Sequence, residues 1–192
     1  MKETTMPNVD LKSAIEEATR SFLSDIEIKS VKSLVDKVVH GSLNNLVTQV
    51  NGHAVAIWLH EQKPEGEALT IAYNVGEKGH DVEGVVSQPL DDGLVSKAFK
   101  EEKTICHQGV FKHKEQSTNV DKELGQMTAH QIAAPFSLFG KTIGAITVIQ
   151  TLAKGYEQQS EWGFDKSDIE YFETSVDTIQ RLLELNVIRK LG

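Results

Sequence analysis

The sequence predicts an α+β fold, in which an antiparallel sheet carries helices drawn from the two ends of the chain. Two observations lead to this prediction. The middle of the chain contains short strand-like segments joined in hairpins, and hairpin-linked strands form antiparallel sheets. Both ends show helical repeats of apolar residues, which are buried most simply together on one face of that sheet.

The N-terminal region predicts two helices. Apolar residues recur at intervals of three and four from Leu11 to Ile26 and again from Val31 to Val47. This spacing is typical of helices over roughly residues 9–26 and 30–50.

A first β-hairpin follows. Residues 54–59 are dense in strand-forming side chains and come directly after the turn pair Asn51-Gly52. Residues 68–73 form a second such run, and the turn-forming residues 63–66 lie between the two. The glycine-rich stretch that comes next is expected to be irregular.

A short helix and another strand are predicted beyond this stretch. Asp91 or Asp92 can cap a helix that carries the apolar residues of 94–99. Residues 104–107 then have the composition of a strand.

The following segment predicts a mobile surface flap over residues 109–128. Residues 112–119 contain no apolar side chain. The apolar residues after them suggest one or two helical turns that end near Gly125.

A second hairpin and a long helix complete the chain. Residues 131–138 and 142–151 read as two strands around a loop that contains a glycine. Asp165 is expected to cap a helix over roughly residues 166–190, with Phe164 and Ile169 as a hydrophobic staple around the cap.

The two faces of the predicted sheet differ in character, because side chains alternate along a strand. One face is bulky and aliphatic, as expected for packing against long helices: Val55, Ile57, Leu59, Ile132, Ala134, Phe136, Ile146 and Val148. The other face is smaller and more polar, and leaves room for a ligand beneath the flap. The alternative is that small residues there let a loop or a short helix approach closely. The candidate ligand-binding residues on this face or near the flap are Trp58, His107, Phe111, Met127, Gln131 and Thr147.

Composition and charge limit the possible functions. The chain has 192 residues, 39% hydrophobic and 25% charged, which fits a helical extension over residues 1–30 and one domain over residues 31–192. A net charge of −8 argues against nucleic-acid or anionic-membrane binding. The lone cysteine, Cys106, and an N-terminus without an apolar signal segment lead us to expect a cytoplasmic protein.

Two segments resemble GAF domains, the small-molecule sensor modules related to PAS domains. Residues 92–105 resemble the family's Gly-Leu/Ile-Val helix, its charged turn and the strand after it. Residues 131–148 are similar to its Ala-Val-Pro-Leu and Ile-Gly-Val strands, and with Phe164-Asp165 the resemblance spans roughly residues 31–188. The resemblance implies a sheet of about six antiparallel strands, terminal helices on one face, a ligand pocket on the other and a sensory or regulatory function.

The family's functional motifs are incomplete in this chain. Phe164 and Asp168 match part of a cyclic-nucleotide motif, but Ile169 replaces its glutamate and no Asn-Lys pair occurs. Cys106-His107 resembles a bilin-attachment pair but lies outside the segment that carries it in phytochromes.

The enzymatic branch of the family, free methionine sulfoxide reductase, forms a disulfide between two cysteines, and this chain has one. We therefore expect no catalysis. The spacing of Cys106, His107 and His113 matches no zinc signature, so we expect no metal site, and the sequence does not name the ligand. The alternatives are an interaction module without a ligand and a redox enzyme that uses Cys106.

The last helix predicts an assembly. Leu182, Leu185 and Ile188 form a second apolar stripe, which needs a partner within the chain or on another subunit. GAF-like modules commonly dimerise through such helices, so we expect a homodimer through the terminal helices and a separate signalling protein as a further partner.

Overall fold

The computed structural model describes residues 37–77, 79–112, 118–152 and 163–191. The predicted helix over 9–26 and residues 113–117 of the predicted flap lie outside the described residues. The helices are α3 (Lys37–Gln49), α4 (Gly93–Glu101), α5 (Thr118–Leu124) and α6 (Lys166–Leu191), with short 3₁₀ helices η1 (Gly79–Val82) and η2 (Val110–Lys112). The strands are β1 (Ala54–Lys63), β2 (Gly66–Gly76), β3 (Ser87–Pro89), β4 (Ile105–Gln108), β5 (Thr128–Leu138) and β6 (Lys141–Thr151).

The strands form one six-stranded sheet in the order β3-β2-β1-β6-β5-β4. Every pairing is antiparallel, and the two predicted hairpins are β1–β2 and β5–β6. The predicted α+β class is therefore confirmed. Strand β3 was not predicted, because it has only three residues and lies among glycines; it pairs with the outer edge of β2.

Local backbone chemistry sets the central hairpin. Phe139 and Gly140 connect β5 to β6 with φ of 51° and 73°. A two-residue turn with both φ values positive matches the twist of antiparallel strands. Further along β6, a Cβ atom at Gly144 would overlap the carbonyl oxygen of Trp58, so only glycine allows β6 to lie this close to β1.

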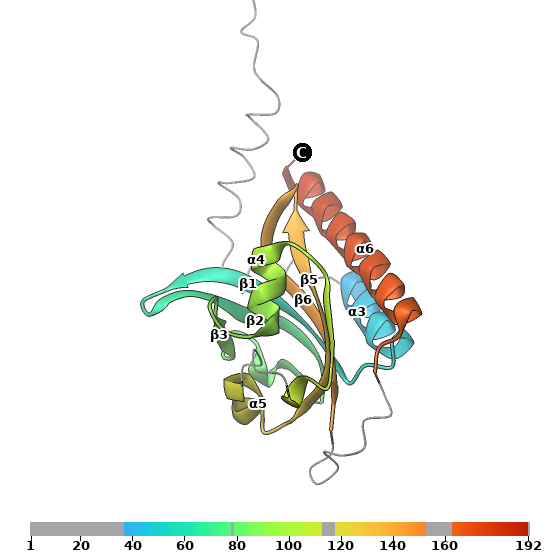
Figure 1. Cartoon of the computed structure of the whole chain (residues 1–192). Helices are drawn as coiled ribbons and strands as arrows, with labels where there is room; N and C mark the ends of the chain where they lie inside the picture. Colours follow the sequence, from blue (N-terminus) through green and yellow to red (C-terminus); the bar gives the residue numbers. More distant parts are fainter. Residues whose placement is uncertain (1–36, 78, 113–117, 153–162, 192) are drawn as a thin grey trace, which may run out of the picture.

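Helices α3 and α6 pack on one face of the sheet (Figure 1). The largest apolar cluster lies there and contains the predicted aliphatic face, joined by residues of the two helices: Leu43, Leu46, Phe172, Val176, Ile179 and Leu183. The predicted difference between the two faces is thus confirmed. None of the described helices is long and apolar enough to cross a membrane.

The starts of the helices agree with the sequence only in part. At α6, the Asp168 amide donates to Asp165 Oδ1 at 3.0 Å and the Asp165 amide donates to Asp168 Oδ2 at 2.9 Å, a reciprocal capping box. At α4, Asp92 occupies the capping position with extended backbone, but its side chain makes no capping hydrogen bond. The prediction that the helix begins at this position is therefore correct, but the predicted hydrogen bond between an aspartate side chain and the helix start is absent.

Candidate functional site

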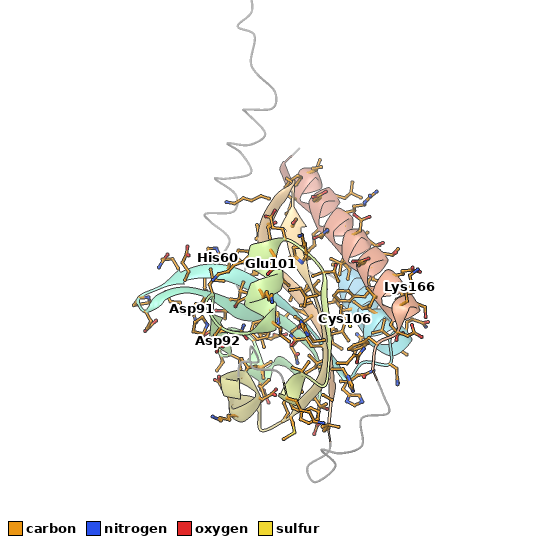
Figure 2. All side chains as sticks on the ribbon, viewed as in Figure 1. His60, Asp91, Asp92, Glu101, Cys106 and Lys166 are labelled. Carbon is orange, nitrogen blue, oxygen red and sulfur yellow. The ribbon has the colours of Figure 1, made fainter. Side chains whose placement is uncertain are left out.

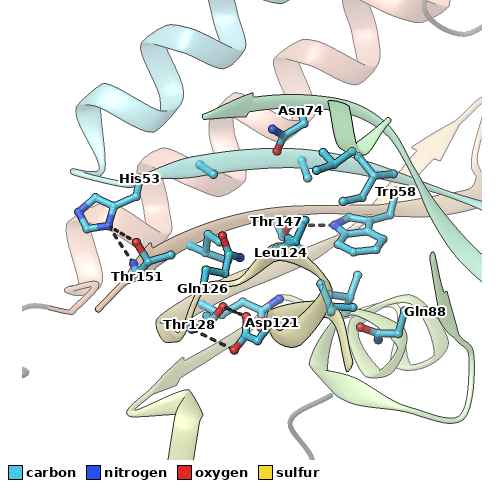
Figure 3. A pocket seen from close by; sticks show the side chains of 18 of the residues that line it. His53, Trp58, Asn74, Gln88, Asp121, Leu124, Gln126, Thr128, Thr147 and Thr151 are labelled. Atoms are coloured by element: carbon cyan, nitrogen blue, oxygen red, sulfur yellow. Dashed lines mark hydrogen bonds between the residues drawn. The ribbon is translucent and has the colours of Figure 1, made fainter. Parts of the chain in front are cut away.

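A cavity lies on the sheet face opposite α3 and α6 (Figure 3). Its walls are the strands β1, β2, β5 and β6, and helices α4 and α5 close it on the other side. The empty space is about 820 Å³, counting solvent at its open mouth. It is lined by His53, Ala54, Ala56, Trp58, Ile71, Asn74, Glu77, Val82, Gln88, Leu94, Val95, Val120, Asp121, Leu124, Gln126, Thr128, Gln131, Thr147, Ile149 and Thr151.

Small side chains create this space and short helices limit it. The short side chains of Ala54 and Ala56 on β1 leave space above the sheet. A second apolar cluster, which includes Trp58, Ile71 and Val95, packs α4 against the sheet and forms part of the cavity wall. This face therefore packs short helices, as the alternative interpretation expects, and also keeps a hollow between them; that a ligand occupies the hollow stays a prediction.

The indole of Trp58 is fixed in the cavity wall. Its Nε1–H donates to Thr147 Oγ1 at 3.1 Å, from β1 to β6 (Figure 3). Trp58 is 4% exposed, so the ring has little freedom to rotate. A rigid aromatic surface with its polar group already bonded suits contact with a flat apolar molecule.

Helix α5 is attached to β5 by one acidic side chain. Asp121 Oδ1 accepts from the Thr128 hydroxyl at 2.7 Å, and Asp121 Oδ2 accepts from the Thr128 amide at 3.0 Å. On another side of the cavity, His53 Nδ1 accepts from the Thr151 amide at 2.9 Å. These bonds hold the rim that Figure 3 shows around the cavity.

Gln131 contributes a side-chain amide to the cavity lining. Its side chain is 7% exposed and lines the cavity, yet it makes no hydrogen bond to any of the residues that the structure describes. Asn74 and Gln88, by contrast, use their amide nitrogens on Gly79 O and Ser96 Oγ, each at 2.9 Å.

Three of the six candidate residues line the cavity and three do not. Trp58, Gln131 and Thr147 are among the lining residues, whereas His107, Phe111 and Met127 are not. His107 pairs with Gln131 in register, which places it on the cavity side of the sheet but on the edge strand β4.

Phe111 and Met127 lie at the ends of the predicted flap rather than at the cavity. Phe111 belongs to η2, where Lys112 Nζ lies 5.1 Å from its ring centroid. Met127 joins α5 to β5, and its carbonyl accepts from the Leu152 amide at 2.9 Å. A role in binding stays a prediction for all six candidates.

Sequence reasoning missed several polar lining residues, among them Asn74, Gln88, Asp121 and Gln126. Asn74 pairs with Ala56, so extending the alternation from β1 across to β2 would have found it. Gln88 lies on the unpredicted β3, and Asp121 and Gln126 come from a segment with no strand pattern.

Cys106 lies on the other face of the sheet. It pairs with Ile132 and packs against the core beneath the long helices; its place on β4 is labelled in Figure 2. Burial, and secondarily the Asp168 carboxylate, raise the pKa of its thiol to about 11. The described residues contain no group of three or more His, Cys, Asp or Glu side chains able to hold a metal.

No family model matches the chain, and no curated protein matches it in sequence. Solved structures do match. A GAF domain/HD domain protein from Geobacter sulfurreducens has a TM-score of 0.61 at 12% identity, over 81% of this chain and 97% of that one. The GAF domain of an Acinetobacter phosphoenolpyruvate-protein phosphotransferase has a TM-score of 0.57 at 13% identity, over 78% and 82%.

An enzyme is also similar in structure. The type II free methionine-R-sulfoxide reductase from Thermoplasma acidophilum has a TM-score of 0.55 at 19% identity, over 74% of this chain and 87% of that one. Identities this low show the architecture and leave the activity open. Since solved GAF domains share this arrangement of sheet and helices over most of their length, the chain has a GAF-like fold.

Proposed function

We propose that this chain is a sensory or regulatory module that binds a small molecule in the cavity and signals through protein contacts. The observation that carries the proposal is the cavity itself, built from small residues on the sheet face away from the long helices and closed by α4 and α5. Similarity to solved GAF domains supports it. No output chemistry is required of the described residues, because the signal passes to a separate protein.

Ligand binding acts first on the elements that close the cavity. A molecule in contact with Val120 and Leu124 stabilises the position of α5, and with it the part of the predicted flap over residues 118–128. The same strands carry α3 and α6 on their other face, so a change in the sheet shifts the long helices. We place this module in the cytoplasm, in keeping with its lone cysteine.

Native mass spectrometry of freshly purified protein tests the proposal. We expect an extra mass that disappears on denaturation, and a dimeric assembly. Protein that carries no extra mass, in preparations from several growth conditions, would contradict ligand binding.

A non-catalytic interaction module is the second candidate. Leu185 and Ile188 on α6 are 62% and 56% exposed, which is unusual for large apolar side chains of one helix. Subunit contacts through α6, without a bound mass, would favour this function over the sensor.

A reductase that uses Cys106 has the weakest support. The sulfur lies on the face away from the cavity, and a thiol with a pKa of about 11 is protonated at neutral pH, whereas the attacking species is the thiolate.

We predict that iodoacetamide alkylates folded Cys106 slowly at pH 8, with a rate that rises toward pH 11, because the folded protein holds the proton more tightly than a free thiol does. Intact mass gives the rate, and protein unfolded in urea is the control. Rapid alkylation of the folded protein at pH 8 would support the reductase hypothesis. So would a reductase activity that is lost in a Cys106→Ser variant.

A further inference from the structure

The charge of the cavity limits what it can bind, given that it binds a small molecule as proposed above. Its described lining residues include two carboxylates, Asp121 and Glu77, and neither a lysine nor an arginine. An anion placed there meets no formal positive charge from these side chains and loses its hydration. The lining therefore opposes phosphates and carboxylates.

The start of α4 does not reverse this preference. Leu94 and Val95 line the cavity, and a helix N-terminus attracts anions. The side-chain amide of Gln88 packs against Gly93 at that end, so closely that a Cβ on Gly93 would overlap it. Gln88 also donates to the Asp92 carbonyl and to Ser96 Oγ, which fixes the amide over the helix start.

The two carboxylates, Asp121 and Glu77, attract a cation in the cavity only weakly. Asp121 already accepts the hydroxyl and the amide of Thr128, and these bonds hold α5 in place. Glu77 is exposed, so water screens its charge.

Gln131 supplies the specific polar contact. A primary amide offers donors on nitrogen and an acceptor on oxygen, side by side in one plane. The residue Gln131 is 7% exposed and lines the cavity, and its side chain makes no hydrogen bond to the described residues, so its amide is available to a molecule in the cavity. A ligand with an adjacent acceptor and donor would pair with both sides of this amide in place of water from the cavity.

We infer that the cavity binds an uncharged, planar molecule with an amide-like edge, such as a carboxamide or a nucleobase, and that Gln131 reads this edge. The indole of Trp58, held by Thr147, provides the apolar surface for the rest of the molecule. Gln131 acts here as a specificity-determining residue.

Three probes of nearly equal shape test the inference: benzamide, benzoate and benzamidine. At neutral pH they are neutral, anionic and cationic. Binding is followed by ¹⁵N,¹H correlation spectra, with the Trp58 indole and the Gln131 amide as reporters inside the cavity. We expect benzamide to bind at least about tenfold more tightly than either charged probe.

Two substitutions at Gln131 separate its role from general packing. Gln131→Leu keeps the size and removes both hydrogen bonds, so benzamide should bind about tenfold more weakly. Gln131→Glu should reverse the order of the probes, with benzamidine now tighter than benzamide. Gln62→Leu, at an exposed glutamine on β1, is the matched control and should change nothing.

The outcomes distinguish the ligand class from the function. If benzoate or benzamidine shifts the reporters of the unsubstituted protein and benzamide does not, the ligand class is wrong and the binding site stands. Equal benzamide affinity in Gln131→Leu and the unsubstituted protein would also overturn the role of Gln131. If none of the probes shifts the reporters, the inference fails, whereas the proposed binding function is decided separately by the native mass spectrometry described above.

Discussion

Trp58 and Thr147 meet in the interior across strands β1 and β6, and both are nearly inaccessible to solvent. A buried indole N–H costs free energy when it loses its acceptor, because no water replaces the lost bond. This pair therefore ties the stability of the sheet to the shape of the cavity wall.

We predict that Thr147→Val destabilises the protein by about 1–3 kcal/mol, since it keeps the side-chain shape but leaves Trp58 Nε1 unpaired. Adding Trp58→Phe to this variant should cost less than Trp58→Phe costs alone. Urea unfolding of the two single variants and the double variant measures this coupling. Strict additivity would show that the hydrogen bond contributes nothing to stability.

His130 makes stability depend on pH. It is 3% exposed, burial lowers its pKa below 6.5, and its Nδ1 accepts from the Gly109 amide at 3.4 Å. The unfolded chain binds a proton near pH 6.5 that the folded chain resists, so the contribution of His130 is full above that pH and is lost as the pH falls below it.

We predict that the free energy of unfolding falls between pH 7 and pH 5, and that His130→Gln falls less steeply over the same range. Chemical denaturation at each pH gives the two slopes. Parallel curves for His130→Gln and the unsubstituted protein would be evidence against this role.

Part of the cavity was predictable residue by residue. Trp58, Gln131 and Thr147 follow from strand alternation, because a strand of known phase presents every second side chain to the same face. Asp121 and Gln126 were not predictable, since α5 reaches the sheet through tertiary contacts that local pattern does not encode.

At the scale of elements, the close approach of β1 and β6 depends on Gly144. We predict that Gly144→Ala destabilises the protein by about 1–3 kcal/mol or more, because the new methyl group overlaps backbone atoms of Trp58 and Leu59 that cannot move alone. Thermal or urea unfolding measures the loss.

Gly41 provides the matched comparison. It lies within α3, and nothing is within 4 Å of a Cβ placed there. Gly41→Ala should stabilise by about 0.5–1 kcal/mol, because alanine favours the helix. Equal effects at the two glycines would refute the steric argument.

The elements themselves divide into predictable and unpredictable groups for a physical reason. The hairpins β1–β2 and β5–β6 and helix α6 have their signals within the segment, as apolar periodicity, turn residues and a capping box. Strand β3 owes its existence to its neighbour β2, so its own three residues carry no comparable pattern.

For the whole molecule, the sheet separates two different layers: α3 and α6 on one face, α4 and α5 on the other (Figure 1). The exposed Leu185 and Ile188 lie on α6, in the outer part of the first layer. This surface is the basis for the proposed homodimer.

We predict that the unsubstituted protein is a dimer and that the double variant Leu185→Lys, Ile188→Lys is a folded monomer, because charges on this surface oppose its burial. Analytical ultracentrifugation gives the mass, and circular dichroism checks that the helices remain. A monomeric unsubstituted protein would rule out this interface.

The alternation of side chains along β1 and β6 also has a consequence for how such a protein can diversify. Ala54, Ala56 and Trp58 line the hollow, whereas Val55 and Ile57 hold the long helices. Mutations at every second position can therefore alter what the chain recognises while the framework beneath the helices keeps its packing. A lineage built on this plan can acquire new specificities without first having to evolve a new scaffold.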